Sequence, residues 1–124
     1  MIARRQLPST YLTDQEWAVI NTFVAKVRSR FAEKLVSVIL YGSRARAEAR
    51  PDSDMDLAVI MTDVDAQTRQ AVRYLAVDVW LESGIYLSTR VWSDPHWQTM
   101  AEIQTSLYQN IHREGIELFH ATPA

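Results

Sequence analysis

The sequence predicts a small α/β (α+β) domain in which a short mixed sheet is covered by helices. Hydrophobic runs rich in β-branched residues, at 35–41 and 55–61, are typical of buried strands. Around them, apolar residues recur at the spacing of an amphipathic helix. With 124 residues, 48% of them hydrophobic, the chain is long enough for one domain with its own core.

Three helices are expected, over residues 14–31, 65–82 and 95–113. Thr13 and Glu16 form a T-x-x-E capping box in front of the first helix. Gly84 follows the second helix, where helices often end in a left-handed residue. Pro95 falls in the first turn of the third helix and Gly115 comes just after its end. The helix boundaries are therefore predicted from the caps as well as from the apolar faces.

Three strands are expected, over residues 35–41, 55–61 and 85–92. The first two are separated by a 12-residue loop, 42–53, which is short for the helical crossover that parallel neighbours need. We therefore expect an antiparallel pair. Residues 1–11 read as a loosely held arm. No linker, internal repeat or low-complexity tract divides the chain, so 1–124 is expected to form a single domain.

Composition excludes several classes of function. The absence of cysteine excludes disulfides, thiolate metal sites and cysteine nucleophiles, and it fits a reducing compartment, so a cytoplasmic protein is expected. No apolar run approaches the ~18–20 residues that cross a bilayer, so no membrane contact is expected. The net charge of −2 argues against a protein that coats nucleic acid, and direct DNA binding is not expected.

The loop between the first two strands carries the residues with the most chemical content. Asp54 and Asp56 lie two positions apart at the start of a strand, which puts both carboxylates on one face with Cα atoms ~6–7 Å apart. Two such carboxylates are ligands that suit Mg²⁺. Gly42 and Ser43 end the preceding strand, where backbone N–H groups and a hydroxyl are able to meet phosphate oxygens. Together they predict a metal-nucleotide site.

Each of these signals has a plainer interpretation when it stands alone. Paired aspartates beside a turn often serve only the turn. The loop arginines Arg44, Arg46 and Arg50 are equally suited to neutralising a triphosphate and to lying in solvent among acidic neighbours. The conjunction of Gly-Ser, ten residues and Asp-x-Asp between two strands favours the functional interpretation.

This segment resembles the signature of the minimal nucleotidyltransferases of the DNA polymerase β superfamily. Gly42-Ser43 and Asp54-Met55-Asp56 match its two halves, and the trailing helix and chain ending are similar more loosely. The resemblance implies a polymerase β-like nucleotidyltransferase fold. It also implies that Gly42 and Ser43 bind the triphosphate and that Asp54 and Asp56 are catalytic ligands of Mg²⁺. From their charge, Arg44 and Arg46 are predicted to bind the nucleotide as well.

The resemblance also implies an activity and a partner. Members of this family transfer a nucleoside monophosphate to a hydroxyl, and AMP from ATP is the expected case here. Their usual partner is a helical HEPN-domain protein, often an RNase toxin, which the small transferase inactivates as an antitoxin by adding AMP to a tyrosine. A chain of 124 residues leaves little room for an acceptor-binding domain, so a separate partner protein is expected.

One departure from the family keeps a second hypothesis open. Full members carry a third carboxylate on a later strand, but the predicted strand 85–92 contains no acidic residue. Asp78 and Glu82 are near in sequence and fall on the predicted second helix. The alternative is a non-catalytic module of the same fold that neutralises a partner by occlusion.

Three tryptophans also allow two interpretations. Trp80, Trp92 and Trp97 are large side chains of the kind that usually fill a core. An exposed patch formed by them would instead suit docking of a partner. The core interpretation is the expected one.

Overall fold

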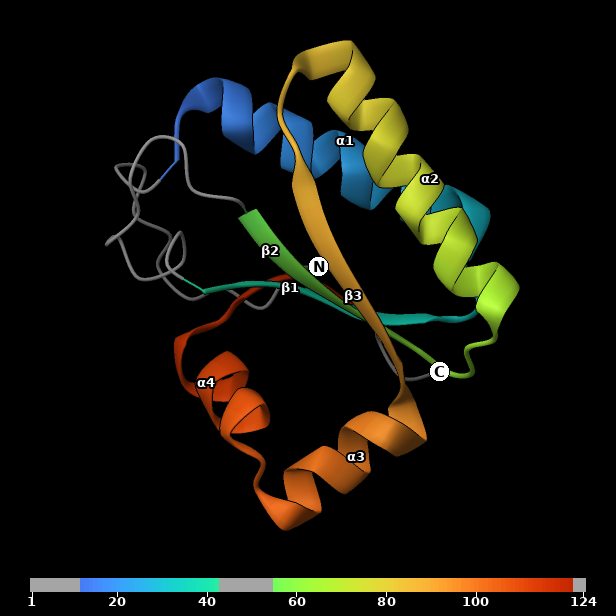
Figure 1. Cartoon of the computed structure of the whole chain (residues 1–124), viewed down its shortest axis with the longest axis vertical. Helices are drawn as coiled ribbons and strands as arrows, with labels where there is room; N and C mark the ends of the chain where they lie inside the picture. The colour runs from blue at the N-terminus through green and yellow to red at the C-terminus, as the bar shows by residue number, and fades with distance from the viewer. Residues whose placement is uncertain (1–11, 43–54, 122–124) are drawn as a thin grey trace.

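In the part of the chain that the structure describes, four strands form one mixed sheet with two helices on each face (Figure 1). The computed structural model describes residues 12–42 and 55–121, so the predicted arm over 1–11 lies outside the described residues. The elements are, in chain order, α1 (Asp14–Arg30), β1 (Leu35–Tyr41), β2 (Met55–Met61), α2 (Ala66–Ser83), β3 (Leu87–Ser93), α3 (Asp94–Ile103), α4 (Ser106–Glu114) and β4 (Ile116–His120). No helix in these ranges is long and apolar enough to cross a membrane.

The sheet contains both antiparallel and parallel pairs. Across the sheet the strand order is β3, β2, β1, β4. β1 runs antiparallel to β2, which confirms the pairing predicted from the loop between them. β2 and β3 are parallel and are joined through α2, as a parallel pair requires. β4 pairs antiparallel with β1, so β3 and β4 are the two edges.

Two hydrophobic layers hold the sheet between its helices. The larger layer lies under α1 and α2 and includes Phe23 and Val72, both fully buried. The smaller layer lies under α3 and α4 and includes Ile60 and Ile111. Because both faces of β2 are covered, the strand is apolar almost throughout, and Asp56 is its one charged residue.

The three tryptophans divide between core and surface. Trp92 and Trp97 pack against the smaller layer with their ring centroids 5.7 Å apart, as expected for core residues. Trp80 is 46% exposed, so the core interpretation is wrong for this residue. Its ring meets Tyr86 edge-on, with centroids 5.9 Å apart.

The single helix predicted over 95–113 is wrong, because the structure divides it into α3 and α4. Gln104 adopts a left-handed conformation, with φ 55° and ψ 53°, and ends α3. The Thr105 hydroxyl then accepts a hydrogen bond from the Tyr108 N–H and caps α4. A continuous helix of that length would extend about 28 Å in one direction. The break lets both halves lie on the same face of the sheet (Figure 1).

β4 is an element that the sequence patterns did not predict. It is only five residues long, and its alternation is limited to Ile116 and Leu118, which are buried in the larger layer. Gly115 allows the chain to enter this strand directly after α4. A Cβ atom at Gly115 would collide with the Ile111 carbonyl oxygen and the Ile39 side chain. Gly115, which was predicted to follow a helix, therefore also allows α4 to pack closely against β1.

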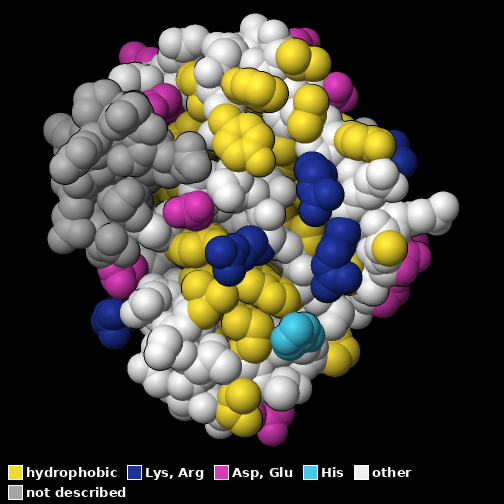
Figure 2. Space-filling view, in the orientation of Figure 1, with side chains coloured by type: hydrophobic (Ala, Val, Ile, Leu, Met, Phe, Trp, Pro, Cys, Tyr) yellow, Lys and Arg dark blue, Asp and Glu magenta, His cyan; other side chains and the backbone are white. Residues whose placement is uncertain are grey.

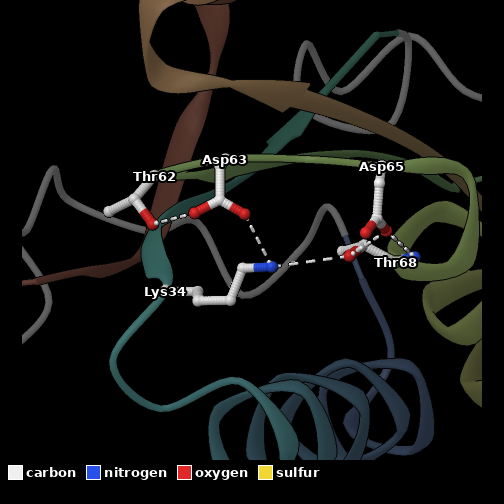
Figure 3. Close-up of polar contacts among 5 residues, drawn as sticks. All are labelled: Lys34, Thr62, Asp63, Asp65 and Thr68. Carbon is white, nitrogen blue, oxygen red and sulfur yellow. Dashed lines mark hydrogen bonds and ion pairs between the residues drawn. The ribbon is translucent and has the colours of Figure 1, made fainter.

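A polar network fastens the end of the sheet away from Asp56 (Figure 3). Lys34, just before β1, forms an ion pair of 2.9 Å with Asp63, just after β2. Its ammonium group also donates to the Thr68 hydroxyl at 3.5 Å. Thr68 in turn donates from its backbone N–H and its hydroxyl to the Asp65 carboxylate, at 2.7 and 2.8 Å. The network thus joins β1, β2 and the first turn of α2.

The Asp65 cap makes part of the protein's stability dependent on acid pH. Hydrogen bonds from Thr68 lower the pKa of Asp65 below its ordinary value of 3.8. A carboxyl whose pKa is lowered by folding stabilises the folded state above its unfolded pKa, and this contribution is lost as the pH falls through the folded value. We expect the wild type to have a higher Tm than Asp65→Asn at neutral pH, and this advantage to vanish in strong acid. Thermal unfolding of both proteins from neutral to strongly acid pH measures the difference in Tm, and Asp78→Asn, at an exposed position within α2, is the control. A difference in Tm between the wild type and Asp65→Asn that does not change with pH would contradict the role of the Asp65 carboxylate.

Candidate functional site

The end of β1 and the start of β2 meet at one end of the sheet. Tyr41, the last residue of β1, is the register partner of Asp56 in β2. Tyr41 is buried and Asp56 is half-buried. The antiparallel pairing therefore brings the residue that follows β1, Gly42, next to the aspartate that opens β2.

Gly42 lies directly against the Asp56 carboxylate. Its φ is +79°, in the left-handed region that side chains disfavour, and a Cβ atom built on it would stand 2.5 Å from Asp56 Oδ2. Only glycine suits both conditions. The structure thus brings together two of the predicted site residues from either side of the loop. The other four, Ser43, Arg44, Arg46 and Asp54, lie outside the described residues.

β3 completes this face of the sheet with residues that the motif does not predict. Alternate residues of a strand share a face, so Asp56 lies on the same side as Ala58, which packs in the smaller layer. The parallel register places Ser88 beside Asp56 and Arg90 beside Ala58. On this face β3 therefore contributes the Ser88 hydroxyl at the level of Asp56 and the Arg90 guanidinium at the level of Ala58, in place of a carboxylate. Asp78 and Glu82 lie on α2, as expected.

Charges from both strands act on the Tyr41 phenol. Burial raises the pKa of Tyr41 above its ordinary value of 10.0, the positive charge of Arg90 opposes this rise, and the negative charge of Asp56 adds to it. The phenol is therefore protonated at neutral pH and is able to donate a hydrogen bond. Arg90 is the residue that the sequence analysis missed, because nothing in the sequence specifies the register of β3 against β2.

The donor set around Asp56 fits a hard divalent cation with shared ligands. Carboxylate oxygens are the preferred ligands of Mg²⁺, which is commonly held by one or two carboxylates together with substrate phosphates. A Cβ atom at position 42 would collide with Asp56 Oδ2, so only glycine lets the backbone approach this carboxylate oxygen so closely. Within the described ranges, no group of three or more His, Asp or Glu side chains is placed to hold a metal by itself. The side chains in these ranges would therefore need further ligands to hold a metal, and Asp54 stays the predicted second carboxylate.

Known proteins share this architecture. A Methanocaldococcus jannaschii protein described as "Putative protein adenylyltransferase MJ0604" is 29% identical over 104 residues, which cover 84% of this chain and 98% of the relative. A structure described as "putative minimal nucleotidyltransferase" is 27% identical, with a TM-score of 0.50, and the match covers 84% of this chain and 95% of that one. A toxin-antitoxin crystal structure with AMP-PNP has a TM-score of 0.53 at 20% identity, covering 81% of this chain and 73% of that one, and it is similar in fold.

The sequence also matches a family model, described as "Polymerase beta, Nucleotidyltransferase", over residues 25–123. That match includes every strand, both halves of the loop motif and most of the helices. It agrees with the mixed sheet covered by helices that the structure displays and with the predicted fold class. The chain therefore belongs to the polymerase beta nucleotidyltransferase family.

Proposed function

We propose that this chain is a Mg²⁺-dependent nucleotidyltransferase that moves AMP from ATP to a hydroxyl group of a partner protein. The observation that carries the proposal is the packing of Gly42 against the Asp56 carboxylate at the junction of β1 and β2. The backbone of a glycine, which no side chain shields, suits the phosphate oxygens of a triphosphate, and the carboxylate beside it suits the accompanying cation. The archaeal relative described as a protein adenylyltransferase supports a protein acceptor.

Each residue of the motif has a role in this proposal. Asp54 and Asp56 hold Mg²⁺, which supplies positive charge against the α-phosphate and the leaving pyrophosphate when it is bound. The backbone at Gly42 and the hydroxyl of Ser43 hold the β- and γ-phosphates, and Arg44 and Arg46 neutralise their charge. These groups position and stabilise, which is most of what phosphoryl transfer requires.

The reaction forms one bond and breaks one bond at the α-phosphorus. The acceptor hydroxyl oxygen attacks this atom, the bond to the β-phosphate oxygen breaks, and pyrophosphate leaves. The hydroxyl proton passes to a base as the new phosphodiester forms. The product is the partner protein carrying AMP.

The partner in this proposal is a HEPN-domain toxin, with the present chain as its antitoxin. The family resemblance supplies this partner, and a structural neighbour is a toxin-antitoxin complex with AMP-PNP.

A labelling experiment tests the proposed transfer. The purified chain is incubated with Mg²⁺ and with ATP labelled at the α-phosphate, in the presence of a partner that co-purifies from the native host. We expect label on the partner, none when Mg²⁺ is chelated, and none from ATP labelled at the γ-phosphate. A complex that stays unlabelled under all three conditions contradicts the proposal.

One observation favours a second candidate, neutralisation of the partner by occlusion alone. β3 presents Ser88 and Arg90, and no carboxylate, on the face of Asp56. A complex that inhibits the partner equally well with and without ATP would support this candidate over transfer.

A further inference from the structure

A second surface lies beside the site, along the open edge of β3. A cavity of about 290 Å³ is lined there by Arg69 and Arg73 of α2, by residues 89–92 of β3 and by His96 of α3. Figure 2 shows Lys and Arg side chains gathered over β3 between α2 and α3, with a His side chain beside them. We call this surface the β3 groove.

In the part of the chain that the structure describes, the β3 groove is lined by three arginines and by no carboxylate. Among the described residues its lining includes Arg69, Arg73, Arg90 and His96, and neither Asp nor Glu. None of the three arginine side chains forms an ion pair or hydrogen bond within the described part of the chain. The whole chain carries a net charge of −2, so the groove is a local reversal of sign. A bound anion would relieve the repulsion among the three arginines.

An aromatic pair lies along the same side of α2 as two of the arginines. Arg69 and Arg73 are one turn apart, and Trp80 follows two turns later, so the three share one flank of the helix. Trp80 is in contact with Tyr86, which is 43% exposed just before β3. Arginine together with exposed tryptophan and tyrosine is the composition of residues that dominate protein interfaces.

The backbone beneath these side chains is a free sheet edge. Among the described strands β3 pairs with β2 alone, so its outer edge presents N–H and C=O groups without a strand partner. An extended peptide added there would point alternate side chains to the two faces of the sheet. Arg69 and Arg73 flank this edge from α2 on one face, and Arg90 of β3 lies on the other face, the side of Ala58. Side chains of both parities would therefore meet positive charge.

We propose that the β3 groove binds an acidic, extended segment of a partner protein as a fifth strand of the sheet. The open edge fits a polypeptide better than a nucleic acid, because only a polypeptide has the backbone N–H and C=O groups that pair with a free strand, and the arginines on both sides of the edge select acidic side chains. Arg90 belongs both to this groove and to the surroundings of Tyr41, so the segment would lead up to the Asp56 site. That the segment belongs to the protein receiving AMP rests on the proposed function.

Binding of a defined peptide, without ATP, tests the groove separately from transfer. The probe is a fluorescein-labelled peptide of alternating Glu and Val residues, followed by fluorescence polarisation. A peptide with Gln in place of Glu and an oligouridylate are the comparison ligands. The groove variant is Arg69→Gln with Arg73→Gln, both exposed positions. The control is Arg28→Gln with Arg30→Gln, which makes the same charge change on α1.

We expect the acidic peptide to bind in a salt-sensitive manner and to lose about tenfold in affinity in the groove variant, with the control unchanged. Hydrogen exchange of the amides of residues 89–92 should slow when the peptide is bound. Equal affinity in both variants, failure to slow exchange, or preference for the oligouridylate would each overturn the proposal. Transfer of AMP is measured separately, in the wild-type protein. If transfer fails while the peptide binds as expected, the proposed function is wrong and the docking surface stands.

Discussion

Replacing Asp56 by asparagine is expected to reduce AMP transfer by on the order of a thousandfold while the fold is retained. Asparagine keeps the size of the side chain and one of its oxygens, but it removes the negative charge that a divalent cation requires. Charge stabilisation by a bound metal is worth several kcal/mol in the transition state, which corresponds to a rate factor of about that size. The initial rate of label transfer from ATP labelled at the α-phosphate measures the effect.

Asp63→Asn is the matched control for this change. Asp56 lies near the start of β2, and Asp63 lies just beyond its other end, where it forms an ion pair with Lys34 (Figure 3). Removing this exposed ion pair is expected to leave transfer unaltered and to change Tm slightly. A second measurement, Mn²⁺ binding by electron paramagnetic resonance with a non-hydrolysable ATP analogue, should weaken in Asp56→Asn alone. Full transfer by Asp56→Asn would refute its role as a metal ligand.

The elements that the sequence predicted well are those whose signals are local. The runs at 35–41 and 55–61 gave both central strands with the bounds that the structure has, because buried strands must be apolar on both faces. The Thr13 capping box placed the start of α1, and helical periodicity placed the start of α2 within a residue. The break at Gln104 was missed because its left-handed conformation serves packing on the sheet, which the helical periodicity on either side does not reveal.

The site was predictable to the extent that it lies in a single loop motif. Gly42 and Asp56 are brought together by an antiparallel pair that the short loop already implied. Ser88 and Arg90 were not predictable, because their place beside Asp56 depends on the parallel register of β3, a tertiary property. The β3 groove likewise combines α2, β3 and α3, and no sequence pattern joins those segments. The roles of Ser43, Arg44, Arg46 and Asp54 stay predictions.

Substituting alanine for Gly42 is expected to reduce transfer by about a hundredfold through displacement of Asp56. The new Cβ atom would stand 2.5 Å from Asp56 Oδ2, so either the carboxylate or the turn must move. Misplacement of a reacting or ligating group by about 1 Å is enough for a rate loss of that size. The left-handed backbone adds a cost of about 1 kcal/mol in stability for any residue with a side chain.

Gly84→Ala separates these two effects, because Gly84 shares the backbone conformation but lacks the contact. Its φ is +78°, almost the same as at Gly42, and nothing lies within 4 Å of where its Cβ atom would be. Both variants should therefore lose stability from backbone strain, whereas only Gly42→Ala should lose transfer and Mn²⁺ affinity. Thermal unfolding and the labelling assay, run on both proteins, make the comparison. If the two variants transfer AMP at the same rate, the close approach of Gly42 to Asp56 does not serve catalysis, and occlusion becomes the better account of the geometry between β1 and β2.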